Sequence, residues 1–239
     1  MTEKARIWEL DVLRGLCILG MVAVHFVYDL VELYALVDWQ YPPLFSLIKN
    51  WGGIVFLLIS GICATLGSRP VRRGGIVLAC GVVCFAVTFA MYRLGLADRS
   101  ILIWFGVLHC LGVCMLLWPL ADRLPTPALA AVGLLLAAAG LALRHVTVSF
   151  PYLIFLGLVP EGFASSDFFP LLPNLGFFLL GAVVGRTAYR QRRTLLPRVN
   201  AHAPVLSFLQ LCGKHSLLIY LLHQPVLAGI LGLVSLAHA

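Results

Sequence analysis

Residues 10–36, LDVLRGLCILGMVAVHFVYDLVELYAL, decide the fold class of this chain. The stretch is long enough to cross a membrane, because about 20 helical residues span a hydrocarbon core of about 30 Å. Comparable apolar runs recur along all 239 residues, of which 61% are hydrophobic and only 11% are charged. Roughly a quarter of the residues of a soluble domain are charged, so the composition indicates an integral membrane protein.

The apolar runs predict an all-α, polytopic membrane helix bundle with about seven transmembrane helices. We expect these helices at residues 10–36, 51–67, 75–96, 101–120, 127–144, 170–188 and 213–237. The apolar run 204–212 is too short to span, and we expect it to form a re-entrant or surface helix that ends at Gly213. The small residues of Trp51-Gly52-Gly53, of Ser60-Gly61 and of the pair Gly181 and Gly185 predict close helix packing. Residues 1–239 are interpreted as a single transmembrane domain.

The net charge of +7 follows the topology of the chain. If the N-terminus is cytoplasmic, the outer segments keep few basic residues, namely Lys49, Arg93, Arg99 and Arg144. This imbalance is what the positive-inside rule describes, so we predict a cytoplasmic N-terminus and an outer C-terminus. Basic residues do not alternate with aromatic residues on a soluble face, so we expect no nucleic-acid partner.

The cysteines do not indicate a disulfide framework, because all seven lie in or beside apolar runs. Cys80 and Cys84, like Cys110 and Cys114, are four residues apart, which would suit metal ligands on a helix. Neither pair has the CxxC spacing or the flanking ligands of a zinc site, however. We therefore expect no metal and interpret these cysteines as small core residues.

The first apolar run carries a face of ionisable residues. Spacings of three or four residues place the following side chains on one side of a helix: Asp11, Arg14, Ile18, Met21, His25, Asp29 and Glu32. A charge deep in a membrane costs about 2.5 to 3.5 kcal/mol on insertion scales, so these groups must face protein or water. Arg14 could instead extend its side chain to the cytoplasmic interface.

His25 and Asp29 are the strongest chemical signal in this face. The carboxylate of Asp29, one turn further along the helix, could accept the imidazole N–H of His25 and leave the other ring nitrogen as a base. A purely structural pair is the alternative. The sequence therefore predicts a histidine base oriented by a carboxylate, inside the membrane.

Two further histidines, His109 and His223, lie within apolar runs. A single histidine in a membrane helix usually forms a hydrogen bond that packs the bundle. If the helices that carry them are neighbours of the first, these groups line a path across the membrane. Pro225 predicts a kink beside His223 and Gln224, because proline removes a backbone donor from the helix. An ordinary proline bend is the alternative.

Several stretches resemble a known family. They are LDVLRG at 10–15 with MVAVHFVYD at 21–29, FLLISG at 56–61, FGVLHCLG at 105–112, KHSLLIYLLHQP at 214–225, and DFFPLLP at 167–173. They are similar to bacterial relatives of the catalytic domain of heparan-α-glucosaminide N-acetyltransferase, within the transmembrane acyltransferase superfamily. The resemblance extends over essentially the whole chain. The interval from Arg14 to His25 resembles the arginine, ten residues, histidine signature of that superfamily.

The resemblance implies an enzyme of a bacterial cytoplasmic membrane. It would take an acyl group, in the first place acetyl, from cytoplasmic acyl-CoA and give it to an amine or hydroxyl of a sugar or lipid acceptor at the outer face. Acyl-CoA would be a co-substrate, with no permanently bound cofactor. His25 would deprotonate the acceptor and Asp29 would orient His25. The implied donor-binding and substrate-binding residues are Arg14, Asp11, His109, His223, Gln224, Trp104 and Asp167.

The chain departs from the family pattern in one respect. The lysosomal branch has Asn at the position of His25 and a histidine in the following loop, whereas this chain has no histidine between His25 and His109. Direct transfer is therefore favoured over an acyl-histidine intermediate. The chain is short for the superfamily, so a second copy or a partner could complete the acceptor pocket. Two other functions remain open, a proton-coupled transporter that uses the Asp, Arg and His column and a catalytically silent scaffold.

Overall fold

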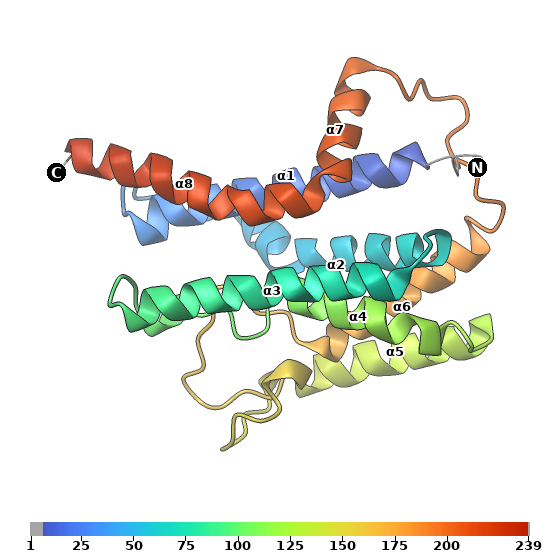
Figure 1. Cartoon of the computed structure of the whole chain (residues 1–239), viewed down its shortest axis with the longest axis horizontal. Helices are drawn as coiled ribbons and strands as arrows, with labels where there is room; N and C mark the ends of the chain where they lie inside the picture. Colours follow the sequence, from blue (N-terminus) through green and yellow to red (C-terminus); the bar gives the residue numbers. More distant parts are fainter. Residues whose placement is uncertain (1–6, 239) are drawn as a thin grey trace. The chain divides into compact units, whose positions relative to one another are not determined.

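The computed structural model describes residues 7–238, which form helices and connecting loops without a strand (Figure 1). The helices are α1 (Trp8–Tyr28), α2 (Pro43–Leu66), α3 (Pro70–Arg93), α4 (Val107–Ala121), α5 (Thr126–Ala142), α6 (Leu171–Thr187), α7 (Pro204–Lys214) and α8 (Ser216–His238). The predicted all-α membrane helix bundle is confirmed. Each of the seven predicted spans overlaps at least one helix, and α7 covers the short helix predicted at 204–212.

Four helical stretches are long and apolar enough to cross a membrane, namely Trp8–Leu33, Pro70–Arg93, Thr126–His145 and Ser216–Ala237. A fifth is α2, in which Pro43–Lys49 and Trp51–Leu66 meet at 41°. The helices α4 and α6 are apolar but shorter. The described residues thus contain four or five spans by length, and the count of seven remains a prediction, as does the orientation of the N-terminus.

The chain divides into two compact units. The first consists of the described parts of Met1–Phe56 and Arg192–Ala239, and the second is Leu57–Gln191. The helix α2 begins in the first unit and ends in the second.

In the first unit, α7 packs against the N-terminal half of α1 through two glycines. A Cβ on Gly15 would collide with the backbone oxygen of Leu209, and a Cβ on Gly213 would lie 2.8 Å from the carbonyl carbon of Asp11. Glycine is therefore needed where the two backbones meet. The prediction that Gly213 ends the short helix is wrong, because α7 continues to Lys214 and the break falls at His215. Gly213 serves close packing instead.

The helices α1 and α8 lie side by side and run in the same direction (Figure 1). Gly213 touches the backbone of α1 between Asp11 and Gly15, and ten residues further along each chain segment His25 meets His223. Beyond them, the hydroxyl of Tyr34 donates to the carbonyl of Ala228 at 3.1 Å. The order of contacts is the same on both helices, so they are parallel.

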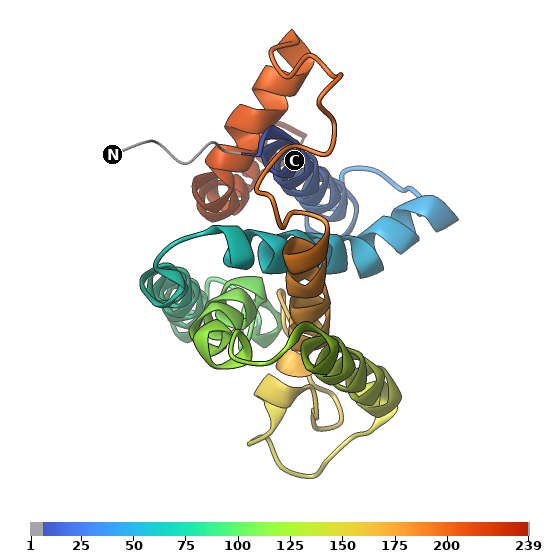
Figure 2. The ribbon, with the colours of Figure 1, turned by 90° about the vertical axis from the view of Figure 1, so that its right-hand side faces the viewer.

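In the second unit, α3 packs on α4, and α6 packs on both α4 and α5 (Figure 2). Glycines again mark the closest approaches. A Cβ on Gly181 would lie 2.7 Å from the backbone carbon of Leu58, and one on Gly185 would lie 3.1 Å from Ile62. A Cβ on Gly61 would lie 2.9 Å from the backbone nitrogen of Ala182. The close packing predicted for Gly61, Gly181 and Gly185 is confirmed. At Gly52 the prediction is wrong, because among the described residues an added Cβ would meet only the side chain of Ile48, at 3.8 Å in the same helix.

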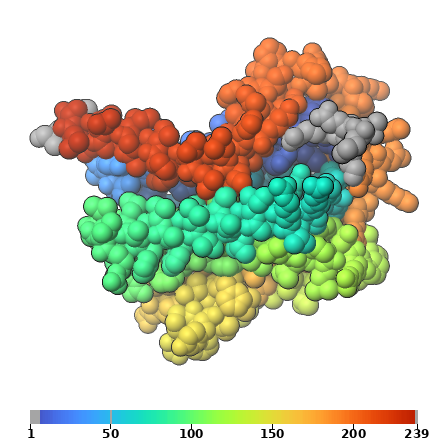
Figure 3. Space-filling view, viewed as in Figure 1, coloured from blue at the N-terminus to red at the C-terminus, as the bar shows by residue number. Residues whose placement is uncertain are grey.

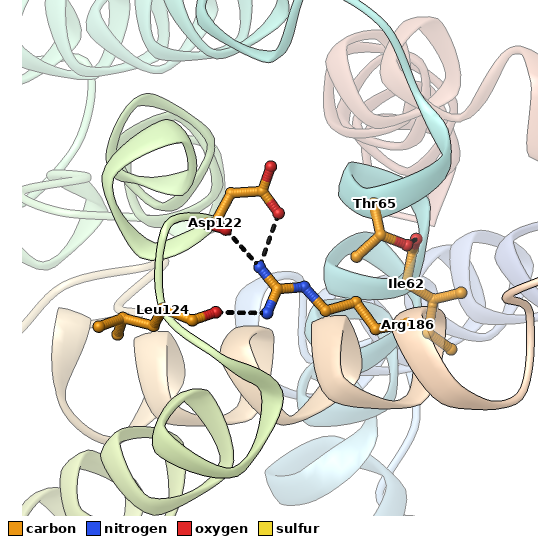
Figure 4. A network of polar contacts seen from close by, with 5 residues as sticks. All are labelled: Ile62, Thr65, Asp122, Leu124 and Arg186. Carbon is orange, nitrogen blue, oxygen red and sulfur yellow. Dashed lines mark hydrogen bonds and ion pairs between the residues drawn. The ribbon is translucent and has the colours of Figure 1, made fainter.

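Arg186, in the last turn of α6, joins this helix to the loop between α4 and α5 (Figure 4). Its guanidinium donates to the carbonyl oxygens of Leu124 and Asp122 and to the Asp122 carboxylate, all at 2.7 Å. The same group lies 5.4 Å from the ring centroid of Trp118. A cation there also suits the negative end of α4. Arg186 therefore holds one end of the second unit together.

The connection between α5 and α6 contains the short 3-10 helices η3 (Leu143–His145) and η4 (Ile154–Leu156). It is exposed in the space-filling view (Figure 3, yellow), and 79% of the surface of Tyr152 is accessible. Its last residues pair with the segment before α4, through a bridge between Phe105 and Phe168. Residues 102–106, which include this bridge, are not helical, so α4 begins at Val107 and not at 101 as predicted.

Candidate active site

Four of the side chains predicted to carry chemistry meet between α1 and α8 in the first unit. The rings of His25 and His223 lie edge to face, with centroids 4.9 Å apart. Asp29 is only 1% exposed, and its Oδ2 accepts a hydrogen bond of 2.8 Å from the side-chain amide of Gln224. The expectation that the helices carrying His25 and His223 are neighbours is confirmed.

The predicted hydrogen bond between His25 and Asp29 is not formed. Because a carboxylate can only accept, the donor to Asp29 must be the NH₂ group of Gln224. This bond runs between helices and not along α1, since a neutral amide donor on α8 lies within reach of the buried carboxylate. At Asp29, α1 also gives way to the π-helical turn η1 (Asp29–Leu33). Asp29 thus anchors α8 and does not orient His25 by a hydrogen bond.

His223 is oriented by its own helix. Its Nδ1 lies 2.6 Å from the carbonyl oxygen of Tyr220. A carbonyl oxygen only accepts, so Nδ1 carries the proton and the lone pair of the neutral ring is on Nε2. That Nε2 is buried and has no hydrogen-bond partner among the described residues. The helix α8 continues through Pro225 beside it without a break.

The N-terminal part of α1 holds a second polar pair. Arg14 donates through Nη2 to the Oδ1 of Asp11, three residues earlier. Asp11 is 2% exposed, whereas a quarter of the Arg14 side chain is accessible. The Nε of Arg14 is buried without a hydrogen-bond partner among residues 7–238. Arg14 is therefore paired within its own helix and still has a donor to offer.

Glu9, a residue that the sequence did not single out, lies one turn from this pair. Its carboxylate is buried and accepts the backbone N–H of Leu195 at 2.8 Å. The contact fastens the start of α1 to the segment that precedes α7. Glu9 is best explained as a structural anchor, and its position at the edge of the apolar run offered no signal for this partner.

In the second unit, His109 and Asp167 both bind the N-terminus of α4. Asp167 accepts the backbone N–H of Val107 through Oδ2 at 3.0 Å, and the Nδ1 of His109 accepts that of Gly106 at 3.2 Å. These contacts satisfy donors that a helix N-terminus leaves without intrahelical partners. His109 is 8% exposed and stacks on Phe105. Both residues therefore have a structural role in positioning α4.

Trp104 lies in the extended segment just before α4. Its backbone N–H donates to the Oγ of Ser165 at 3.4 Å, and its ring is 5.8 Å from that of Phe85 on α3. Ser165 in turn donates to the carbonyl of Leu102 at 2.8 Å. Nothing in the sequence marks Ser165, because a serine in a loop carries no pattern that reveals its contacts with Leu102 and Trp104.

Among the described residues, no group of three His, Cys, Asp or Glu side chains could hold a metal ion. All seven cysteines are free thiols. The polar groups in the described part of the first unit that could serve a ligand include the His25 and His223 rings, the Gln224 amide oxygen and the Arg14 guanidinium, and the Oε2 of Glu9 and the hydroxyl of Tyr41 are also buried without a hydrogen-bond partner there. Such a set can bind hydrogen-bond donors, move a proton and attract an anion.

The family described as heparan-alpha-glucosaminide N-acetyltransferase, catalytic, matches residues 6–225, which is most of the chain. No curated protein and no solved structure matches. The matched range includes every predicted site residue from Asp11 to Gln224. This integral membrane protein belongs to the family of the heparan-α-glucosaminide N-acetyltransferase catalytic domain.

Proposed function

We propose that the chain is a membrane acyltransferase that moves an acyl group, in the first place acetyl, from acyl-CoA to an amine or hydroxyl of a sugar or lipid acceptor. The observation that supports this most is the buried cluster of His25, Asp29, His223 and Gln224 between two apolar helices. Ionisable residues inside a membrane are expensive and are usually functional. The chain belongs to an acetyltransferase family, so acyl transfer is the reaction that we assign to this cluster.

The chemistry needs one proton transfer at the acceptor. The nitrogen or oxygen of the acceptor attacks the thioester carbonyl carbon, the C–S bond breaks, and CoA leaves as a thiolate that takes up a proton. An imidazole within hydrogen-bond reach of the acceptor receives the proton that the nucleophile loses. The His25–His223 pair supplies two imidazoles in one place. Direct transfer to the acceptor requires no acyl-enzyme intermediate.

The other polar residues have supporting roles in this proposal. Arg14, which keeps a free Nε beside its pair with Asp11, would bind an anionic or pantetheine part of the donor from the cytoplasmic side. In the second unit, His109, Trp104 and Asp167 hold the start of α4, and their roles toward the donor and the acceptor stay predictions. A second copy of the chain or a partner would complete the acceptor pocket in the cytoplasmic membrane.

The decisive experiment measures release of the CoA thiol from acetyl-CoA by the purified protein in detergent or nanodiscs. His25→Ala should reduce turnover by at least about 100-fold, because the variant removes one ring of the His25–His223 pair and the support of the other, and general acid–base groups typically contribute 10²- to 10⁴-fold. His145→Ala is the matched control, since His145 is exposed in the loop after α5. An unchanged rate in His25→Ala would reject the catalytic assignment. Proton-coupled transport without thioester cleavage would favour the transporter instead.

A further inference from the structure

His223 is the better defined of the two imidazoles. Its Nδ1 lies 2.6 Å from the carbonyl oxygen of Tyr220 on the same helix, and this contact keeps the ring proton on Nδ1. The lone pair of the neutral ring is thereby held on Nε2, which is buried between α1 and α8. His25 makes no hydrogen bond to Asp29, whose Oδ2 accepts from Gln224. The tautomer suited to a general base is therefore imposed on His223 and not on His25.

Gln224, the next residue, offers a second buried acceptor. Its amide NH₂ is committed to Asp29, so its Oε1 cannot exchange places with the nitrogen. That Oε1 is buried and makes no hydrogen bond within residues 7–238. A buried polar atom without a hydrogen-bond partner carries a free-energy cost. A ligand that carries N–H or O–H groups would recover this cost at Gln224 and at His223.

The two side chains are held against α1 by different contacts. The ring of His223 rests on the ring of His25, and the amide of Gln224 is tied to Asp29 one turn later. Both acceptor atoms therefore belong to the same α1–α8 interface. Such a pair of acceptors fits a nucleophile that still carries its protons, which is an amine or a hydroxyl. It does not fit a thioester, which has no donor to offer.

We propose that His223, with its Nε2, is the general base of the transfer, and that the Oε1 of Gln224 holds the nucleophile; this assignment rests on the proposed acyltransferase function. The acceptor loses its proton to Nε2 of His223 as its lone pair forms the new bond to the thioester carbonyl carbon. The C–S bond breaks, and the proton passes from His223 to the leaving sulfur. His25 acts as a positioning residue that supports the His223 ring.

The test uses a variant that keeps the structural contact and loses the base. In His223→Asn, the amide nitrogen can replace Nδ1 as donor to Tyr220, but no group replaces Nε2. We expect turnover of acetyl-CoA with glucosamine to fall by about 10²- to 10⁴-fold. With hydroxylamine, a stronger nucleophile that depends less on a base, the loss should be at least ten times smaller. The binding of CoA, measured by titration calorimetry, should be unchanged.

Three outcomes would overturn the assignment or its basis. Wild-type rates in His223→Asn would exclude His223 as the base. Equal losses with glucosamine and hydroxylamine, together with weaker CoA binding, would show that His223 only supports the structure. If the wild-type protein itself releases no CoA thiol with either acceptor, the proposed function fails, and this result is distinct from the first two. Restoration of turnover by added imidazole in His223→Ala would support the assignment.

Discussion

Replacing Gly213 by alanine should separate α7 from α1 and disturb the polar cluster further along the helices. The new Cβ would lie 2.8 Å from the carbonyl carbon of Asp11, and the oxygen of that carbonyl is nearer still. Ordinary contact begins at 3.4 Å, so relief at the carbon alone requires 3.4 − 2.8 = 0.6 Å, and the oxygen demands more. Overpacking of this kind costs about 1 to 3 kcal/mol.

The same displacement should reach the His25–His223 contact, which lies ten residues further along both segments. A misplacement of about 1 Å can cost about 100-fold in rate. We therefore expect Gly213→Ala to lower both the melting temperature in detergent and the release of CoA thiol. Gly229→Ala is the control, because Gly229 lies in α8 with nothing within 4 Å of its added Cβ. If the two variants melt and turn over alike, the close contact at Gly213 does not position the cluster.

Two further predictions concern the second unit. Arg186→Ala should destabilise the second unit by about 1 to 2 kcal/mol in a thermal melt, since the contacts to Asp122 and Leu124 are lost. Arg186→Lys should recover part of the lost stability. An unchanged melting temperature in Arg186→Ala would show that these contacts do not stabilise the unit. Asp167→Ala should cost about 1 to 2 kcal/mol through the uncapped N–H of Val107, whereas Asp167→Asn keeps an acceptor oxygen and should cost less. Equal melting temperatures for these two variants would contradict the capping role.

The positions of the helices were largely predictable because each is an apolar run, and burial in a membrane depends mainly on composition and length. The start of α4, however, was not predictable. Residues 102–106 are as apolar as a helix requires, but they pair with a loop some 60 residues later, through Phe105 and Phe168. Such a long-range pairing leaves no periodic pattern in either segment, so residues 101–106 were assigned to a span.

The candidate site was predictable in its residue types and less so in its contacts. The spacing of His25 and Asp29 correctly indicated a face toward protein, since Asp29 is buried. The partner of Asp29 could not be found by spacing, because Gln224 comes from a helix 195 residues away in the chain. Nor could the carbonyl of Tyr220 be foreseen as the group that orients His223. Every residue of a helix carries a backbone carbonyl, so the sequence does not indicate which one a histidine will bind.

Gly213 shows the same limit in a single residue. A glycine near the end of an apolar run can end a helix or admit a neighbouring backbone, and the sequence is identical in both cases. Only the position of Asp11 against α7 decides between them.

The shared direction of α1 and α8 constrains how often the chain crosses the bilayer. Two parallel spans both enter from the same side, so the segments between them must cross an odd number of times, and the total number of crossings must be odd. Four crossings are thus excluded if both helices span. At least one of the shorter or bent helices, α2, α4 or α6, must then also cross, and the N-terminal end of α1 and the C-terminal end of α8 face opposite compartments.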